Sequence, residues 1–219
     1  MRVVADDDVG LQCRLHESKT TVGLVLFPGN GEVASDYDEL AGRFASIGAS
    51  LAVMSHRGYG QSEGQPSLRR ALQDAPIVLA AVAAEWPARR LVVMGRSLGS
   101  AYAAELCRLA PARMAGVVIE SGFSDLRGLI RRRGLEPPAA LDEADVRDFG
   151  SPAKVASWPG PRLILHGVDD RLIPFSEALV LHAAAPGATL HPVAGRGHND
   201  LMLATDYWQA LGTFVRSLG

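Results

Sequence analysis

The chain has 219 residues, 47% of them hydrophobic, and a formal net charge of −2, so it can bury a sizeable core within one domain but lacks the excess positive charge that holds a nucleic-acid backbone. Its longest apolar run, residues 75–84, is about half as long as the roughly twenty residues of a membrane-spanning helix, and residues 1–10 lack the basic end and apolar centre of a signal peptide. The sequence therefore predicts a cytoplasmic protein with no membrane span and no nucleic-acid partner.

Short apolar runs alternate with longer stretches rich in Ala and Leu, which predicts a mostly parallel, doubly wound α/β sheet with helices on both faces. Residues 10–18 alternate between apolar and polar and are predicted as an antiparallel edge strand. The later strands are apolar throughout, as expected of parallel strands covered on both faces. They are predicted at residues 22–27, 50–54, 90–95, 115–120 and 161–167, with a last strand at 188–193. Helices are predicted at about residues 35–47, 67–85, 98–110, 175–185 and 200–217.

One stretch, residues 123–158, is longer than an ordinary crossover and contains two adjacent prolines at 137 and 138. We predict one or two short helices there that lie over the strand ends as a small lid, within a single domain of residues 1–219. Its basic run, residues 131–133, is interpreted as a solvated helix face.

The pattern Gly-x-Ser-x-Gly occurs twice, and the structure expected around each copy distinguishes them. Ser97 directly follows the apolar strand at 90–95 and directly precedes a predicted helix, so the turn between them holds the serine in a strained conformation and exposes its hydroxyl. Gly95 and Gly99 fit a turn that has no room for side chains, and the helix N-terminus favours an oxyanion. Ser62 lies in a glycine-rich loop without either element. We therefore predict Ser97, not Ser62, as a nucleophile.

A serine nucleophile needs a general base, and six histidines are available. His198 lies in a glycine-rich loop between the last predicted strand and the last predicted helix, so it can project over the sheet. His56 and His166 follow or end strands, but glycines beside them indicate packing roles. The remaining three are predicted to be structural or exposed: His16, His182 and His191.

The acid that orients the histidine has three candidates. Asp169 and Asp170 follow the strand that precedes the His198 loop, and Glu120 ends the strand before that one. For the oxyanion hole, the backbone N–H of Leu98 is one predicted donor. The glycine-rich loop after residues 22–27 supplies the second, with the N–H of Asn30 preferred over that of Gly31.

These residues together resemble the α/β-hydrolase superfamily over nearly the whole chain, and in particular its small, nearly capless serine aminopeptidase-like, Bem46-like and depalmitoylating members. Five motifs in order carry the resemblance: PGNGE at 28–32, HRGYGQSEG at 56–64, GRSLGS at 95–100, HGVDDRLIP at 166–174 and GRGHND at 195–200. In the family's acid motif the carboxylate follows the glycine by three positions, which selects Asp170 over Asp169. The resemblance also implies a structural role for the loop that holds Ser62.

The chain departs from the family's pattern at two places. Pro28 stands where a histidine usually precedes the oxyanion-loop glycine, so the support of that loop is expected to be different. At most one or two strands are expected before Val22, where relatives often carry more chain or a membrane anchor.

The predicted activity is hydrolysis of a carboxylic ester or thioester with a small to medium acyl group, through an acyl-enzyme at Ser97. Two alternatives remain open. One is an aminopeptidase-like or amide hydrolase, whose anchor for a substrate amine would be Glu120, Glu32 or Asp200; the other is a non-catalytic binding protein of the same fold.

Four apolar residues are predicted as walls of the substrate pocket: Phe123, Leu126, Leu129 and Met202. Cys13 and Cys107 are isolated in the sequence, with no spacing typical of metal ligands or of a disulfide scaffold. We therefore predict no metal and no cofactor, and a small-molecule acyl substrate as the binding partner. The oligomeric state is not indicated by any feature of the sequence.

Overall fold

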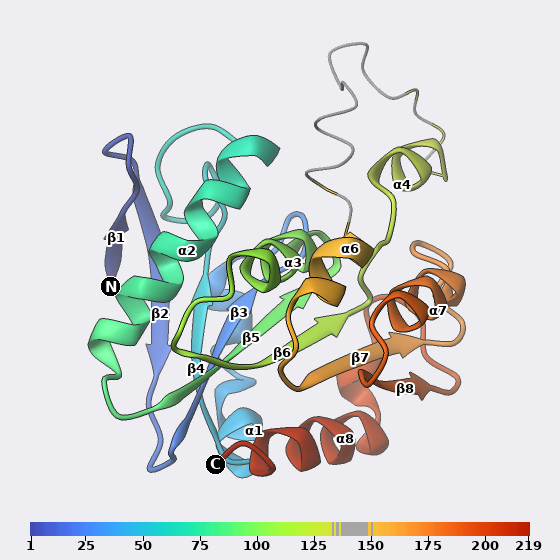
Figure 1. The fold of residues 1–219 in the computed structure, drawn as a ribbon. Helices are drawn as coiled ribbons and strands as arrows, with labels where there is room; N and C mark the ends of the chain where they lie inside the picture. The colour runs from blue at the N-terminus through green and yellow to red at the C-terminus, as the bar shows by residue number, and fades with distance from the viewer. Residues whose placement is uncertain (133, 135, 137–148, 150) are drawn as a thin grey trace.

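The computed structural model describes residues 1–132, 134, 136, 149 and 151–219, and these residues form a mostly parallel sheet between two layers of helices (Figure 1). The strands lie in the order β1-β2-β4-β3-β5-β6-β7-β8. All pairs from β4 to β8 are parallel, whereas β2 runs antiparallel to β4 and β1 antiparallel to β2. Their bounds are β1 Arg2–Val4, β2 Gly10–His16, β3 Val22–Phe27, β4 Ala49–Met54, β5 Arg90–Arg96, β6 Met114–Glu120, β7 Arg162–Gly167 and β8 Thr189–Val193.

The strand predicted at residues 10–18 is antiparallel as expected, but the prediction that it forms the edge is wrong. β1 pairs with its outer side, with Val3 opposite Leu11, and is itself the edge of the sheet. Two strands before Val22 agree with the expectation of at most one or two, but β1 had no predicted bounds, because a strand of only three residues is too short to show an alternating pattern in the sequence.

Two helical layers explain why the central strands are apolar at every position. Val25 and Phe27 of β3 face the core under one layer, and Leu24 and Leu26 face the core under the other. The first layer consists of α2 (Leu68–Glu85), α3 (Ser100–Leu109), α6 (Ser151–Ser157) and α7 (Phe175–Ala184). The second consists of α1 (Ala41–Ser46) and α8 (Thr205–Arg216), with two 3₁₀ turns at Ala34–Tyr37 and Leu201–Leu203.

Two predicted helices are each divided in the structure. Residues 35–47 form a 3₁₀ turn and then α1, and the carboxylate of Asp36 accepts a hydrogen bond from the Val33 N–H at 2.9 Å, which caps the first turn locally. Residues 200–217 form a 3₁₀ turn and then α8, because Ala204 has an extended backbone with ψ of 135°. In both cases the 3₁₀ turn follows a loop at the carboxyl edge of the sheet, and the interruption separates that turn from the α-helix.

The stretch predicted as a lid, residues 123–158, is described in two parts. α4 (Leu126–Arg132) lies beyond the carboxyl end of β6 (Figure 1). α6 does not lie over the strand ends, because its Val155 and the following Trp158 are buried in the core beneath the first helical layer. The remainder of the expected lid falls on residues 133, 135, 137–148 and 150, outside the described residues.

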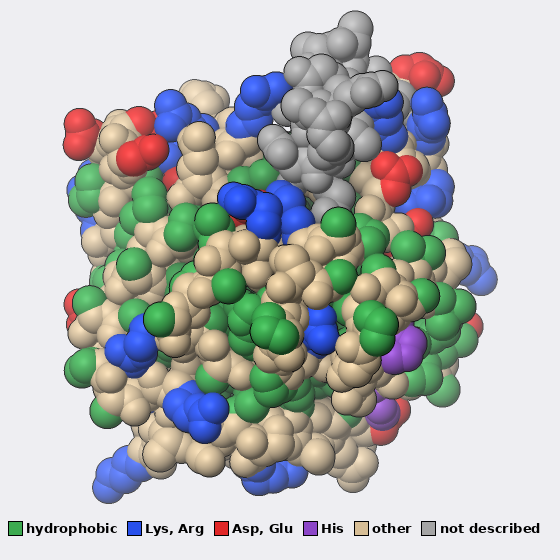
Figure 2. Space-filling model, in the orientation of Figure 1, with side chains coloured by type: hydrophobic (Ala, Val, Ile, Leu, Met, Phe, Trp, Pro, Cys, Tyr) green, Lys and Arg blue, Asp and Glu red, His purple; other side chains and the backbone are tan. Residues whose placement is uncertain are grey.

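Charged side chains are dispersed on the face shown in Figure 2, where basic groups lie between acidic, apolar and uncharged ones. Arg131 and Arg132 of α4 are exposed, and Arg132 pairs with Glu177 at 2.7 Å. For these two arginines the prediction of a solvated helix face is confirmed.

Candidate active site

The turn between β5 and α3 has the geometry of a nucleophile elbow. Ser97 directly follows β5, begins a 3₁₀ turn that leads into α3, and has a positive φ of 51°, which a non-glycine residue rarely adopts. A Cβ atom on Gly95 would lie 2.3 Å from the Gly99 carbonyl oxygen, and one on Gly99 would lie 1.9 Å from the carbonyl oxygen of Phe27. The two glycines are therefore required by the close approach of backbone, and the half-buried Ser97 is held in a strained conformation.

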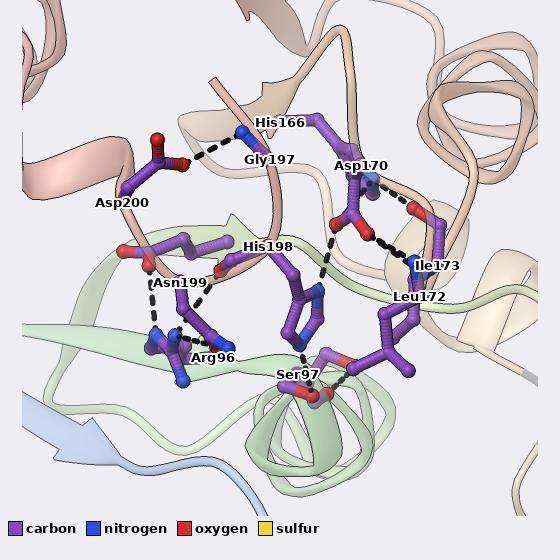
Figure 3. A network of polar contacts seen from close by, with 12 residues as sticks. Arg96, Ser97, His166, Asp170, Leu172, Ile173, Gly197, His198, Asn199 and Asp200 are labelled. Atoms are coloured by element: carbon purple, nitrogen blue, oxygen red, sulfur yellow. Dashed lines mark hydrogen bonds and ion pairs between the residues drawn. The ribbon is translucent and has the colours of Figure 1, made fainter.

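Three side chains from three loops form a continuous hydrogen-bonded chain at this elbow (Figure 3). The Nε2 atom of His198 lies 2.9 Å from the Oγ of Ser97, and its Nδ1 atom lies 2.7 Å from Oδ2 of Asp170. Ser97 follows β5, Asp170 follows β7 and His198 follows β8. Because these strands are parallel, their carboxyl ends lie at one edge of the sheet, where ligands bind in open α/β sheets.

Asp170 is held in place by donors on both oxygens. Its Oδ1 accepts hydrogen bonds from the N–H groups of Leu172 and Ile173, each at 2.8 Å. Burial acts to raise the pKa of the Asp170 carboxyl, but hydrogen bonds from His166, His198 and Ile173 outweigh it and hold that pKa below its usual range. The carboxylate is therefore ionised wherever His198 can act as a base.

The competing acids occupy other positions. Asp169 is exposed, whereas Asp170 is buried against His198. Glu120 is buried, and its carboxylate accepts hydrogen bonds from Arg96 at 3.1 Å and from the Tyr207 hydroxyl at 2.7 Å. Burial raises the pKa of Glu120, although Arg96 acts in the opposite direction.

Arg96 links the loops around Ser97, and sequence reasoning did not identify it. Its Nη1 donates to Glu32 and its Nε to Glu120. Its Nη2 donates to the His198 carbonyl oxygen at 3.1 Å and to Asn199 Oδ1 at 3.0 Å (Figure 3). An arginine at the end of a strand whose preceding residues are apolar or glycine was the available signal, because a buried guanidinium requires partners. The partners themselves are far apart in the sequence.

The loop after β3 is supported without the histidine that the family usually has there. The Oε2 atom of Glu32 accepts the Gly29 N–H at 2.6 Å, and His56 Nε2 lies 2.9 Å from the carbonyl oxygen of Pro28. Burial lowers the pKa of His56, so the neutral imidazole donates this hydrogen bond. The expectation of a different support is met by these two side chains.

The two residues predicted as oxyanion donors lie together. Asn30 and Leu98 line one small cavity of about 140 Å³. The Oδ1 atom of Asn30 accepts a hydrogen bond from the Tyr59 hydroxyl at 3.0 Å, which ties the loop after β3 to the loop after β4. Gly31, the reserve donor, has a positive φ of 86°.

Three of the four predicted pocket walls share one cluster, but the fourth, Met202, lies elsewhere, so the four do not form one pocket. Phe123 and Leu126 are buried in a cluster with Ala101, which Leu129 packs against. Met202 lines a different crevice of about 490 Å³ between the loop after β3 and the turn before α8.

The second serine of the Gly-x-Ser-x-Gly pattern and four further histidines lie outside the hydrogen-bonded chain at Ser97. Ser62 is buried; its hydroxyl donates to the Ser55 carbonyl oxygen at 2.7 Å and accepts the Gln12 N–H at 2.9 Å, so it links the loop after β4 to β2. His166 is buried and lies 2.8 Å from the Ile173 carbonyl oxygen, beside the predicted acid. The remaining three lie on β2, α7 and β8: His16, His182 and His191. Within the described ranges, no three His, Cys, Asp or Glu side chains are grouped as metal ligands would be.

Comparison with known proteins identifies a family and several relatives of this chain. A family model described as serine aminopeptidase, S33 matches residues 18–138, more than half of the chain. An uncharacterized membrane protein of Saccharomyces cerevisiae is 26% identical over 215 residues, which cover 93% of this chain and 74% of that protein. Human alpha/beta hydrolase domain-containing protein 17C is 27% identical over 197 residues, covering 84% of this chain and 54% of its own length. The chain thus spans between about half and three quarters of these relatives.

Solved structures share the fold at low sequence identity. An esterase from Rhodococcus has a TM-score of 0.77 and 19% identity, with 100% of this chain and 99% of that one covered. Est1E from Butyrivibrio proteoclasticus, solved with ferulic acid bound, has a TM-score of 0.82 and 17% identity, with 100% and 98% covered. These likenesses confirm the α/β-hydrolase fold predicted from the sequence.

In the part of the chain that the structure describes, no helix has the length and apolar character needed to cross a membrane. The predicted cytoplasmic location stays a prediction, and one relative is itself named a membrane protein.

Proposed function

The chain belongs to the serine aminopeptidase S33 family of the α/β-hydrolase superfamily, and we propose that it is a serine hydrolase with Ser97 as nucleophile, His198 as general base and Asp170 as the acid that orients the base. The observation that carries this proposal is the unbroken hydrogen-bonded chain from Ser97 through His198 to Asp170, which starts at a strained turn between strand and helix.

Each of these three side chains has a defined part in acyl transfer. The Oγ of Ser97 attacks the substrate carbonyl carbon while Nε2 of His198 takes the hydroxyl proton. The same Nε2 then gives that proton to the departing alcohol or thiol, which leaves an acyl-enzyme. Water, deprotonated by Nε2 of His198, attacks the acyl carbon. The bond between that carbon and Ser97 Oγ then breaks, His198 returns the proton to Oγ, and the acid is released. Asp170 holds Nδ1–H and stabilises the imidazolium in both steps.

The developing negative charge on the carbonyl oxygen needs two donors. We assign the backbone N–H groups of Leu98 and Asn30 to this role, because both residues line one cavity and Leu98 directly follows Ser97. Leu98 lies in the first turn of a helix, where N–H groups have no intrahelical carbonyl partner and the dipole favours an anion.

An ester or thioester is favoured over a peptide with a free amino terminus. A substrate ammonium would need an acidic anchor, and all three candidate carboxylates already have partners. Glu32 and Glu120 pair with Arg96, and Asp200 accepts the Gly197 N–H at 2.7 Å. A carboxylesterase or thioesterase activity therefore fits the site better than an aminopeptidase activity.

The proposal is tested with p-nitrophenyl acetate and with a fluorophosphonate probe followed by intact mass. We expect Ser97→Ala to fold normally, to lose the probe adduct and to lower kcat/KM by at least about 10⁴-fold. Ser62→Ala, the same change in the second copy of the pattern, is the matched control and retains the adduct.

A wild-type protein that gains no probe mass would instead support a non-catalytic binding protein of the same fold. Full activity of Ser97→Ala would show that a different nucleophile is used.

A further inference from the structure

A small cavity borders the two proposed oxyanion donors, and its walls come from the loops after β3 and β4, which lie on the opposite side of β5 from the strand before His198. It has a volume of about 140 Å³, and its walls include Asn30, Leu98, Tyr59, Leu68, Ala71 and Tyr102. Asn30 comes from the loop after β3, Tyr59 from the loop after β4, and Leu68 and Ala71 from the start of α2. None of these residues was among the predicted pocket walls.

The strand order determines which part of a substrate this cavity can receive. β4 and β3 lie on one side of β5, whereas β7 and β8, whose loops carry Asp170 and His198, lie on the other. The leaving group must be within reach of His198 Nε2, which protonates it. A substrate whose carbonyl oxygen lies between Leu98 and Asn30 therefore directs its other substituent, the acyl chain, toward the β3–β4 side.

We infer that this cavity is the acyl subsite and that it takes an unbranched, uncharged acyl chain of two to about five carbons. The inference rests on the proposed function. An apolar protein cavity of roughly 150 Å³ holds a molecule the size of benzene, so a cavity of about 140 Å³ has room for a chain of about five carbons. A palmitoyl chain exceeds this space several-fold.

The charges at the cavity favour an uncharged chain. Arg57 also lines the cavity. Its guanidinium, however, donates two hydrogen bonds to Asp74, each at 2.6 Å, and two to Asp7, at 2.8 and 2.9 Å. These two carboxylates more than neutralise it, so an acyl chain ending in a carboxylate meets no unpaired cation here. His56, on the same wall, is buried, and burial lowers its pKa and keeps it neutral.

The test measures kcat/KM for p-nitrophenyl esters of two, four, six, eight and twelve carbons. For the wild type we expect a rise of roughly fourfold per methylene up to four carbons and a fall of at least tenfold by eight. The p-nitrophenyl hemisuccinate, with a charged four-carbon chain, is expected to react at least tenfold more slowly than the butyrate.

Variants at Leu68 locate the subsite. Leu68 is 37% exposed at the start of α2, so substitutions there are compatible with folding. Leu68→Ala is expected to move the optimum to longer chains, and Leu68→Trp to lower the butyrate-to-acetate ratio at least tenfold. Leu179→Ala, at a 49% exposed position on α7, is the control and leaves the profile unchanged.

A Ser97-dependent profile that peaks at eight or more carbons, or that responds to Leu126→Ala and not to the Leu68 variants, would overturn the acyl subsite and leave the proposed function intact. Absence of any Ser97-dependent hydrolysis would overturn both.

Discussion

Replacement of Arg96 by methionine tests whether the buried ion network supports the site. Arg96 is 7% exposed and donates to Glu32, Glu120, the His198 carbonyl oxygen and Asn199. Methionine keeps much of the volume but removes every donor, and it leaves two carboxylates near each other without a cation. Breaking a buried ion pair by removing one partner destabilises a protein by about 3–5 kcal/mol. We expect the free energy of unfolding to fall by that amount at pH 7.

The loss of unfolding free energy in Arg96→Met is expected to be larger at high pH than at low pH. Burial already raises the pKa of Glu120, and Arg96 is the main group that counteracts this shift. Without Arg96 the folded-state pKa of Glu120 rises further above its unfolded value, so the folded variant binds more protons and its stability falls as pH rises. Urea unfolding at pH 5 and pH 8 should therefore show a smaller deficit, relative to wild type, at pH 5.

The variant also tests whether Arg96 positions His198. We expect kcat to fall roughly 10- to 100-fold with a smaller change in KM, because the loop that carries the base loses its anchor. Arg96→Lys keeps the charge but cannot reach all four acceptors, so it should recover only part of kcat. Arg14→Met removes a half-exposed ion pair with Asp38 and should change stability by at most about 1 kcal/mol. A deficit below 1 kcal/mol for Arg96→Met, with kcat unchanged, would refute this reasoning.

Three further outcomes are expected. Asp170→Asn should lower kcat by about 10⁴-fold in the p-nitrophenyl acetate assay, because His198 loses the partner that fixes its tautomer. It should also lower the thermal unfolding temperature at pH 7, because a buried carboxylate whose pKa is held below its usual range stabilises the folded protein. Gly99→Ala should lower the free energy of unfolding by at least about 3 kcal/mol, since its Cβ would lie 1.9 Å from a backbone oxygen of β3. Gly31→Ala, with open space around it and φ of 86°, should lower the same free energy by only about 1–2 kcal/mol, and equal losses for the two would contradict the steric argument. Burial raises the pKa of both cysteine thiols to about 12, so iodoacetamide should label Cys13 and Cys107 only after unfolding, and rapid labelling of the native protein would contradict their burial.

Local patterns predicted much of this protein. The apolar runs predicted the central strands because parallel strands buried on both faces need apolar side chains at successive positions. The elbow at Ser97 was predictable because a strand, a serine between glycines and a helix follow one another within a few residues. Asp170 and His198 lie in loops after consecutive strands, so the parallel order placed them at the edge where Ser97 lies. Their roles stay proposals until the variants are measured.

Features that depend on distant partners were not predictable. β1 is an edge strand only because it pairs with β2, and its three residues carry no pattern of their own. Phe123 and Met202 are apolar residues a few positions after Glu120 and His198 in the sequence. Phe123 nevertheless packs in a cluster with Ala101, whereas Met202 lines the crevice before α8. A hydrophobic residue carries no information about which of several nearby clusters will bury it.

The fold class, the central strands of the sheet and the three side chains that meet at its carboxyl edge could all be predicted from the residues alone, because each depends on hydrophobic periodicity or on a short motif. The folded protein was needed to see how Arg96 joins Glu32, Glu120 and the His198 loop, and where a cavity lies beside Asn30 and Leu98. Both depend on residues up to about a hundred positions apart whose contacts arise only when the helices and loops pack together.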